Sequence, residues 1–222
     1  MKRYQEPRPR LPNLWPALLL LGAALTVAWA GAGSRFGPQW FRWLFRHRPA
    51  GIIIHHTASD GWRNGKLLDA AMVDAYHASK GWGTTYKGKT YHIAYHYLIL
   101  ADGNVEPGRP ERAPGAHTRG HSDYLGVCLV GNFSSADNPD GRMKPDRPTP
   151  EQMKSLTALL RDLMRRYDFT TDDIHRHRDF VQTDCPGDRF PFNDLIATLR
   201  EPGVDSGKPV TYNGSESDSP TP

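Results

Sequence analysis

Cysteine is scarce in this chain, with two among 222 residues. Two cysteines can form one bridge at most, which excludes a small fold built on a disulfide framework. The run HExxH, which places two zinc-binding histidines on one helix, is absent, and so are internal repeats and nucleic-acid-binding motifs. The net charge of +4 is small, and much of the basic excess precedes residue 50. The charge therefore favours contact with an envelope or membrane, and we expect no nucleic-acid partner.

The length suits one domain with flanking segments. Residues 1–13 are polar and basic, residues 14–33 are apolar without a charge, and residues 34–48 form a basic, aromatic linker. The folded domain is expected over residues 49–200. Residues 201–222 contain almost nothing apolar and are expected to be disordered. These boundaries predict a single, monomeric catalytic or binding domain behind an N-terminal hydrophobic helix.

The apolar segment 14–33 indicates export, in one of two forms. Its length is close to the roughly 20 residues that cross a bilayer. The small-x-small triplets at 28–30 and 30–32 are instead typical of a signal-peptide cleavage site. The segment WFRWLFRHR at 40–48 favours a retained anchor, because interleaved aromatic and arginine side chains suit a membrane surface. We predict a membrane-anchored protein of the cell envelope with its domain on the periplasmic or wall-facing side; the alternative is a cleaved and secreted form.

Strand and helix patterns alternate along the rest of the chain. A helix is predicted over 150–167, where Thr149 is the N-cap, Pro150 is the first helical residue and Gln152 completes a capping box. The other elements follow from hydrophobic periodicity and turn signals: strands at 51–56, 95–100, around Val105, 125–131 and near 173–177, and helices at 67–79 and 192–200. This order predicts an α/β domain with a central mixed β-sheet flanked by helices.

Two histidine-containing segments, IIIHHTAS at 52–59 and HRHRDFVQTDCPGD at 175–188, resemble parts of one metal site. Imidazole nitrogen and thiolate sulfur are ligands that zinc prefers, and three protein ligands leave a fourth position open for chemistry. Cys185 lies in the polar second segment and is predicted to be a ligand. Cys128 lies in the apolar run LGVCLVG and is predicted to be a buried thiol.

The residues alone leave the histidine ligands open. Only one of His55 and His56 can face the site, because successive strand residues point to opposite faces. The same alternation leaves both His175 and His177 eligible.

Six blocks in a fixed order carry a resemblance to a known family. They are IIIHHTAS, YHASKGWG at 76–83, AYHYLILADGNVEPGR at 94–109, GAHT at 115–118, LGVCLVGNF at 125–133 and HRDFVQTDCPGD at 177–188. Over about residues 50–200 the chain resembles the zinc amidases that cut N-acetylmuramoyl-L-alanine bonds in peptidoglycan, a family that includes phage lysozyme-type amidases and peptidoglycan recognition proteins.

The resemblance implies one Zn²⁺ per chain, bound by His55, His177 and Cys185, and peptidoglycan or muropeptides as substrate. It implies hydrolysis of the amide bond between N-acetylmuramic acid and L-alanine. The alternative is a non-catalytic peptidoglycan-binding receptor on the same fold, but such relatives typically lack the cysteine ligand.

The resemblance also implies roles for residues around the metal. Tyr95 is expected to stabilise charge on the substrate carbonyl oxygen, and His117 and Trp82 are expected to contact substrate. Some relatives have a lysine two residues before the last ligand, where this chain has Thr183, so a general-acid lysine is not expected. Asp179 is the expected hydrogen-bond partner of a ligating histidine.

Overall fold

Five strands form the central sheet of the computed structural model, which describes residues 48–201. Their order is β7-β6-β8-β1-β9. The strands are β1 (Ile52–His56), β6 (Tyr97–Ile99), β7 (Val105–Pro107), β8 (Leu125–Leu129) and β9 (Ile174–Arg176). β6, β8, β1 and β9 run parallel, whereas β7 pairs antiparallel with β6. The prediction of a mixed sheet is confirmed.

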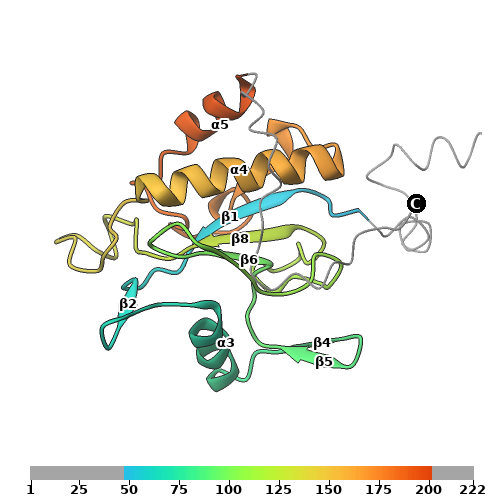
Figure 1. Ribbon diagram of the computed structural model, residues 1–222, viewed down its shortest axis with the longest axis horizontal. Coiled ribbons are helices and arrows are strands. Elements are labelled where there is room, and N and C mark those ends of the chain that lie inside the picture. Colours follow the sequence, from blue (N-terminus) through green and yellow to red (C-terminus); the bar gives the residue numbers. More distant parts are fainter. Residues whose placement is uncertain (1–47, 202–222) are drawn as a thin grey trace, which may run out of the picture. The chain divides into compact units, whose positions relative to one another are not determined.

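Helices cover both faces of this sheet (Figure 1). α4 (Pro150–Tyr167) and α5 (Phe192–Arg200) lie on one side, and α3 (Ala70–Ser79) lies on the other. α4 begins as predicted: the Thr149 side chain accepts from the Gln152 backbone, and the Gln152 side chain accepts from the Thr149 backbone. Two 3₁₀ segments, Thr171–Asp173 and His177–Asp179, flank β9. The predicted single α/β domain with flanking helices is therefore confirmed.

Strand alternation divides the core into two layers. Ile52 and Ile54 pack in the cluster that contains the buried leucines of α4, whereas Cys128 packs in the cluster that contains Val73 of α3. His55 is in register with Cys128 on the neighbouring strand, so it lies on the α3 face of the sheet. His56 lies on the opposite face. Both cysteines are free and buried, as predicted for Cys128.

Two small hairpins were not predicted from the sequence. One pairs β2 (Trp62–Arg63) with β3 (Lys66–Leu67), and the other pairs β4 (Thr84–Tyr86) with β5 (Lys89–Tyr91). Each turns through two residues of positive φ, for example Asn64 at 53° and Gly65 at 75°. Asn-Gly is the preferred sequence for such a turn, so the first hairpin had a readable signal.

Several predicted elements are longer than the elements in the structure. The helix expected at 67–79 begins at Ala70, because the Asp69 side chain accepts a 2.8 Å hydrogen bond from the Met72 backbone and caps it there. The strand expected at 95–100 covers Tyr97–Ile99, since Leu100 donates to the Asn104 carbonyl and belongs to the turn. The strand expected at 125–131 ends at Leu129.

The predicted N-terminal helix at 14–33 and most of the predicted tail at 201–222 lie outside the described residues. Within residues 48–201, no helix is both long enough and apolar enough to cross a membrane.

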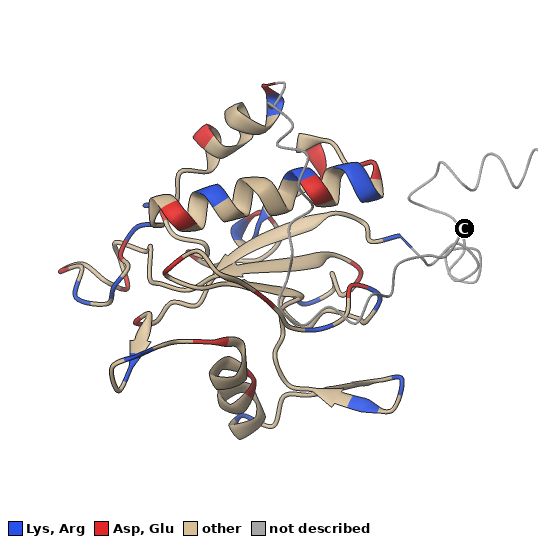
Figure 2. Cartoon of the chain, in the orientation of Figure 1, with Lys and Arg blue, Asp and Glu red and all other residues tan. Residues whose placement is uncertain are grey.

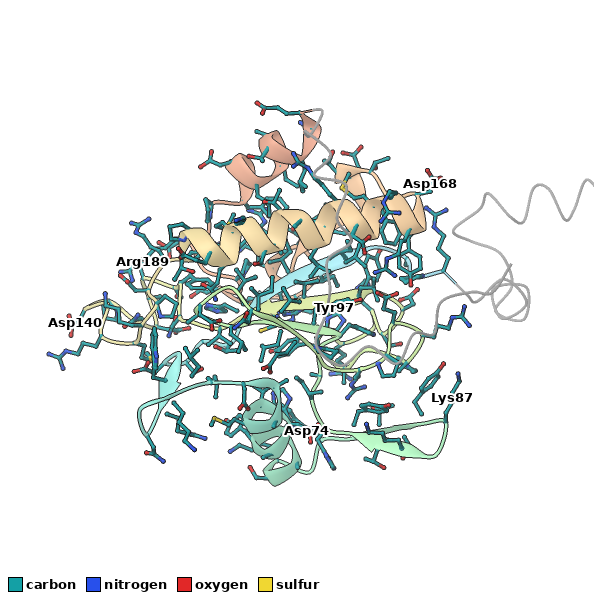
Figure 3. The ribbon with its side chains drawn as sticks, viewed as in Figure 1. Asp74, Lys87, Tyr97, Asp140, Asp168 and Arg189 are labelled. Carbon is teal, nitrogen blue, oxygen red and sulfur yellow. The ribbon has the colours of Figure 1, made fainter. Side chains whose placement is uncertain are left out.

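A half-buried carboxylate joins the sheet to α4. Glu111 accepts hydrogen bonds from the hydroxyls of Tyr97 and Tyr167. It also accepts two hydrogen bonds of 2.7 Å from two nitrogens of the Arg166 guanidinium. Tyr97, which belongs to β6, is labelled near the middle of the sheet in Figure 3. The helix α4, to which Arg166 and Tyr167 belong, has charges of both signs along its length (Figure 2). Burial alone would raise the pKa of Glu111, but the hydrogen bonds from Arg166, Tyr167 and Tyr97 hold the pKa below its ordinary value of 4.5.

We expect Glu111→Gln to lower the free energy of unfolding by about 1–3 kcal/mol at pH 7, because charged hydrogen bonds are lost in a largely buried place. The lowered pKa of the folded state stabilises the fold above pH 4.5, and this contribution is lost as pH falls through the folded-state pKa. Urea unfolding at several pH values should therefore show the difference shrinking in acid. Glu151→Gln, an exposed change on α4, should cost under about 0.5 kcal/mol. Equal costs for the two variants would contradict this role.

Candidate metal centre

Three side chains from separate elements converge on the α3 face of the sheet. His55 belongs to β1, His177 opens the 3₁₀ segment after β9, and Cys185 lies in the following loop. Their ligand atoms all lie within 4.8 Å of one another. The Nδ1 atom of His55 is 3.7 Å from the Cys185 Sγ. Tetrahedral zinc places a nitrogen and a sulfur ligand about 3.6 Å apart, so these atoms fit that ion.

The fold explains why these residues meet. β1 and β9 are parallel neighbours with Ile54 beside Arg176, so the residues that follow, His55 and His177, emerge side by side. The loop carrying Cys185 is tied to the same place, because the Arg178 N–H donates a 3.1 Å hydrogen bond to the Cys185 carbonyl. The site thus stands near the carboxyl ends of parallel strands, where α/β sheets commonly bind ligands.

The electrostatics of the three groups also suit a cation. Burial, and then the neighbouring His117 and His177, lower the pKa of His55 well below its ordinary value, so its ring is neutral and keeps a lone pair. Burial lowers the pKa of His177 as well. Burial raises the pKa of Cys185 to about 12, although the His56 N–H and Arg178 oppose this. A thiolate therefore needs further positive charge, which a bound metal supplies.

The other candidate histidines lie elsewhere. The Nδ1 atom of His56 accepts a 3.1 Å hydrogen bond from the Phe133 backbone, on the α4 face of the sheet. The His175 ring lies 5.0 Å from that of Phe180. Of the two pairs that alternation left open, His55 and His177 are the members whose ligand atoms lie close enough to Cys185 to hold a metal ion with it.

Aromatic rings extend from the metal centre to the surface. The Tyr95 ring is 5.3 Å from His55, and the His77 ring is 5.9 Å from Tyr95 and 5.0 Å from Trp82. Trp82 is 52% exposed. Burial, and then Cys128 and Cys185, raise the pKa of Tyr95 well above its ordinary value, so it remains a phenol that can donate a hydrogen bond. The Tyr95 side chain packs against the buried cluster that contains Cys128.

α3 is anchored beside these rings by a carboxylate. Asp74 accepts hydrogen bonds from the backbone N–H groups of His92 and Ile93, at 2.8 and 2.7 Å. Figure 3 shows Asp74 on the side of α3 that faces the chain leading from β5. This contact fixes the helix that carries His77 against the segment that carries Tyr95.

Two polar residues have partners that the sequence did not predict. His117 is 8% exposed, and its Nδ1 atom is 3.0 Å from the Nε2 atom of His55. The His117 ring thus packs against His55 and is not on an open surface. Asp179, expected to bond a ligating histidine, accepts instead from the Arg176 backbone at 2.7 Å and from the Arg176 guanidinium. A buried histidine in a loop gives no periodic signal, so sequence reasoning could not place His117 here.

A mixed-sheet α/β domain whose carboxyl edge holds two histidines, a cysteine and a nearby tyrosine is a candidate for the class of metal-dependent hydrolases. Comparison with known proteins is consistent with this class. Residues 45–188 match the model of the family Amidase_2, described as N-acetylmuramoyl-L-alanine amidase. The match covers more than half of the chain, and the chain belongs to this family of amide hydrolases.

Individual relatives agree. An endolysin of Klebsiella phage KP32 is 30% identical over 142 residues, which are 64% of this chain and 82% of the endolysin. The human N-acetylmuramoyl-L-alanine amidase is 34% identical over 159 residues, which are 68% of this chain but 24% of that protein. Among solved structures, the endolysin amidase LysCS from Clostridium intestinale URNW is 35% identical with a TM-score of 0.55, covering 70% of this chain and 86% of that chain.

Proposed function

We propose that this chain is a zinc-dependent N-acetylmuramoyl-L-alanine amidase that hydrolyses the bond between N-acetylmuramic acid and the L-alanine of the stem peptide. The observation that carries the proposal is the convergence of His55, His177 and Cys185 within 4.8 Å. Family membership supports the choice of bond. The donor set of two neutral imidazoles and a thiol suits Zn²⁺, and three ligands leave one position for chemistry.

Each residue has a distinct task in this reaction. His55, His177 and Cys185 would hold the zinc ion, which would act as a Lewis acid and lower the pKa of a water molecule bound to it. The Tyr95 phenol donates a hydrogen bond to the substrate carbonyl oxygen as negative charge develops there. Thr183, which stands where some relatives have lysine, accepts a 3.3 Å hydrogen bond from the Cys185 backbone and shapes the ligand loop. The leaving amine must therefore obtain its proton from another group.

Trp82 is proposed as a substrate contact, because it is exposed and its ring follows His77 and Tyr95 away from the metal centre. We expect Trp82→Ala to raise KM about 2- to 12-fold with little change in kcat, since lost stacking costs about 0.5–1.5 kcal/mol. Trp62, 44% exposed on β2, provides the matched control. Steady-state kinetics on a soluble muropeptide would contradict the assignment if Trp62→Ala and Trp82→Ala behaved alike.

The alternative function is a non-catalytic peptidoglycan-binding receptor. The presence of Cys185 together with both histidines favours the enzyme. A zymogram on purified peptidoglycan separates the two: we expect a cleared zone that disappears with a zinc chelator and returns with added zinc. Binding to the peptidoglycan without clearing under all three conditions would support the receptor.

The proposed substrate places the domain facing the cell wall. The retained anchor at 14–33 remains a prediction from the sequence. We expect membrane fractions to hold the full-length chain with an N-terminus near Met1. A soluble form that begins at Gly31 or Gly33 would show a removable signal instead.

A further inference from the structure

His117 lies in a hydrogen-bonded series that ends at a metal ligand. Its Nε2 atom is 3.0 Å from the Tyr124 carbonyl oxygen, and its Nδ1 atom is 3.0 Å from the His55 Nε2. The Nδ1 atom of His55, on the far side of that ring, is the one that approaches Cys185. One continuous series thus joins a backbone carbonyl to the ligand atom of His55.

The carbonyl fixes the direction of every hydrogen bond in this series. A carbonyl oxygen can only accept, so His117 carries its proton on Nε2 and donates it to Tyr124. A neutral imidazole has one N–H, which leaves the His117 Nδ1 as an acceptor. His55 must then donate from Nε2, and its Nδ1 lone pair is directed to the metal centre. The Thr118 hydroxyl lies 3.1 Å from the His117 Nδ1 and 3.5 Å from the His55 Nε2, so its oxygen can also accept from the His55 N–H.

Two glycines make room for the His117 ring. A Cβ atom added at Gly115 would stand 2.6 Å from the His117 Nε2, and one added at Gly126 would stand 2.6 Å from its Cγ. Both distances are far below van der Waals contact. Gly126 lies in the central strand β8, beside Ile53 of β1, so neither the strand nor the ring can easily move aside. The ring position is therefore built into the fold.

We propose that His117 is a positioning residue for zinc: it holds His55 in the tautomer that presents Nδ1 to the ion. This inference rests on the proposed zinc-dependent function. It differs from the role expected from the sequence, which placed His117 in contact with substrate. Partners of this kind orient metal-bound histidines and raise their basicity, and their removal typically weakens metal binding by about 10–100-fold.

Zinc affinity measured by competition with a chelator tests the proposal on the full chain. His117→Phe keeps a ring but removes the acceptor, so we expect zinc to bind about 10–100-fold more weakly, with KM near the wild-type value once zinc is saturating. His117→Asn restores an acceptor oxygen near the Nδ1 position and should recover much of the affinity. Unchanged zinc affinity in His117→Phe, with a raised KM, would overturn the proposal and return His117 to the substrate site.

Gly126→Ala is the second variant, because it displaces the ring without removing any polar group. Weaker zinc binding in this variant is expected, and wild-type affinity in a folded Gly126→Ala chain would contradict the proposal. Titration of the wild type with zinc distinguishes failure of the role proposed for His117 from failure of the proposed zinc-dependent function. A wild type that binds zinc while the variants bind equally well overturns only the role of His117, whereas a wild type without zinc affinity overturns the proposed function itself.

Discussion

Cys185→Ser should remove zinc from the purified protein and reduce hydrolysis by roughly 10³-fold or more. Serine stays protonated at neutral pH and is a far poorer zinc ligand than thiolate. Loss of about 4 kcal/mol of transition-state stabilisation corresponds to a factor of about 10³ in rate. Metal analysis of the purified chain, together with an assay of stem-peptide release, checks both parts. Retention of one zinc per chain in Cys185→Ser would contradict the ligand assignment.

The chain offers matched controls for this experiment. Cys128→Ala removes the other cysteine, which is fully buried and outside the donor set, so zinc should remain. The adjacent histidines form a second pair: His55→Ala should lose zinc, whereas His56→Ala should retain it because its ring bonds the Phe133 backbone. Equal loss of zinc in both histidine variants would indicate general unfolding instead of a specific ligand.

Tyr95→Phe should lower kcat by roughly 10²-fold or more while leaving zinc content unchanged, as for loss of one donor to a developing oxyanion. The substitution keeps the ring and removes only the hydroxyl. Turnover at saturating substrate and zinc content are the two measurements.

The same variant distinguishes two roles of the hydroxyl. The Tyr95 side chain packs against the cluster that contains Cys128, so a purely structural role of the hydroxyl would lower stability and leave kcat near normal. Near-normal turnover in Tyr95→Phe would therefore assign the hydroxyl to the core. Cys128→Ala changes this neighbour alone and should change turnover much less than Tyr95→Phe does.

Periodic patterns allowed much of the fold to be predicted from sequence. The strand containing Ile52–Ile54 is uncharged and β-branched, and α4 has a capping box and a regular leucine stripe; both lie where expected. The hairpins around Asn64 and Lys87 were missed because each strand has only two or three residues, although the Asn64-Gly65 turn of the first hairpin is itself a recognisable signal. Such strands are too short to show alternation.

The part of the candidate site that could be predicted from the sequence is the part that depends on residue type. Histidine and cysteine side chains indicate a metal site. Strand alternation shows that only one of His55 and His56 can face it, and the resemblance to a family chose His55. Alternation could not choose between His175 and His177, because both lie on the same side; the resemblance to a family made that choice. Contacts between loops, such as His117 with His55, depend on tertiary packing and leave no local pattern.

Mass spectrometry of the products from purified peptidoglycan tests the central claim most directly. The full chain should release stem peptides that begin with a free L-alanine amine and leave intact glycan strands. Zinc chelation should stop this release, and added zinc should restore it. New reducing sugar ends, cleavage within the stem peptide, or release that continues in the chelated protein would contradict a zinc-dependent amidase.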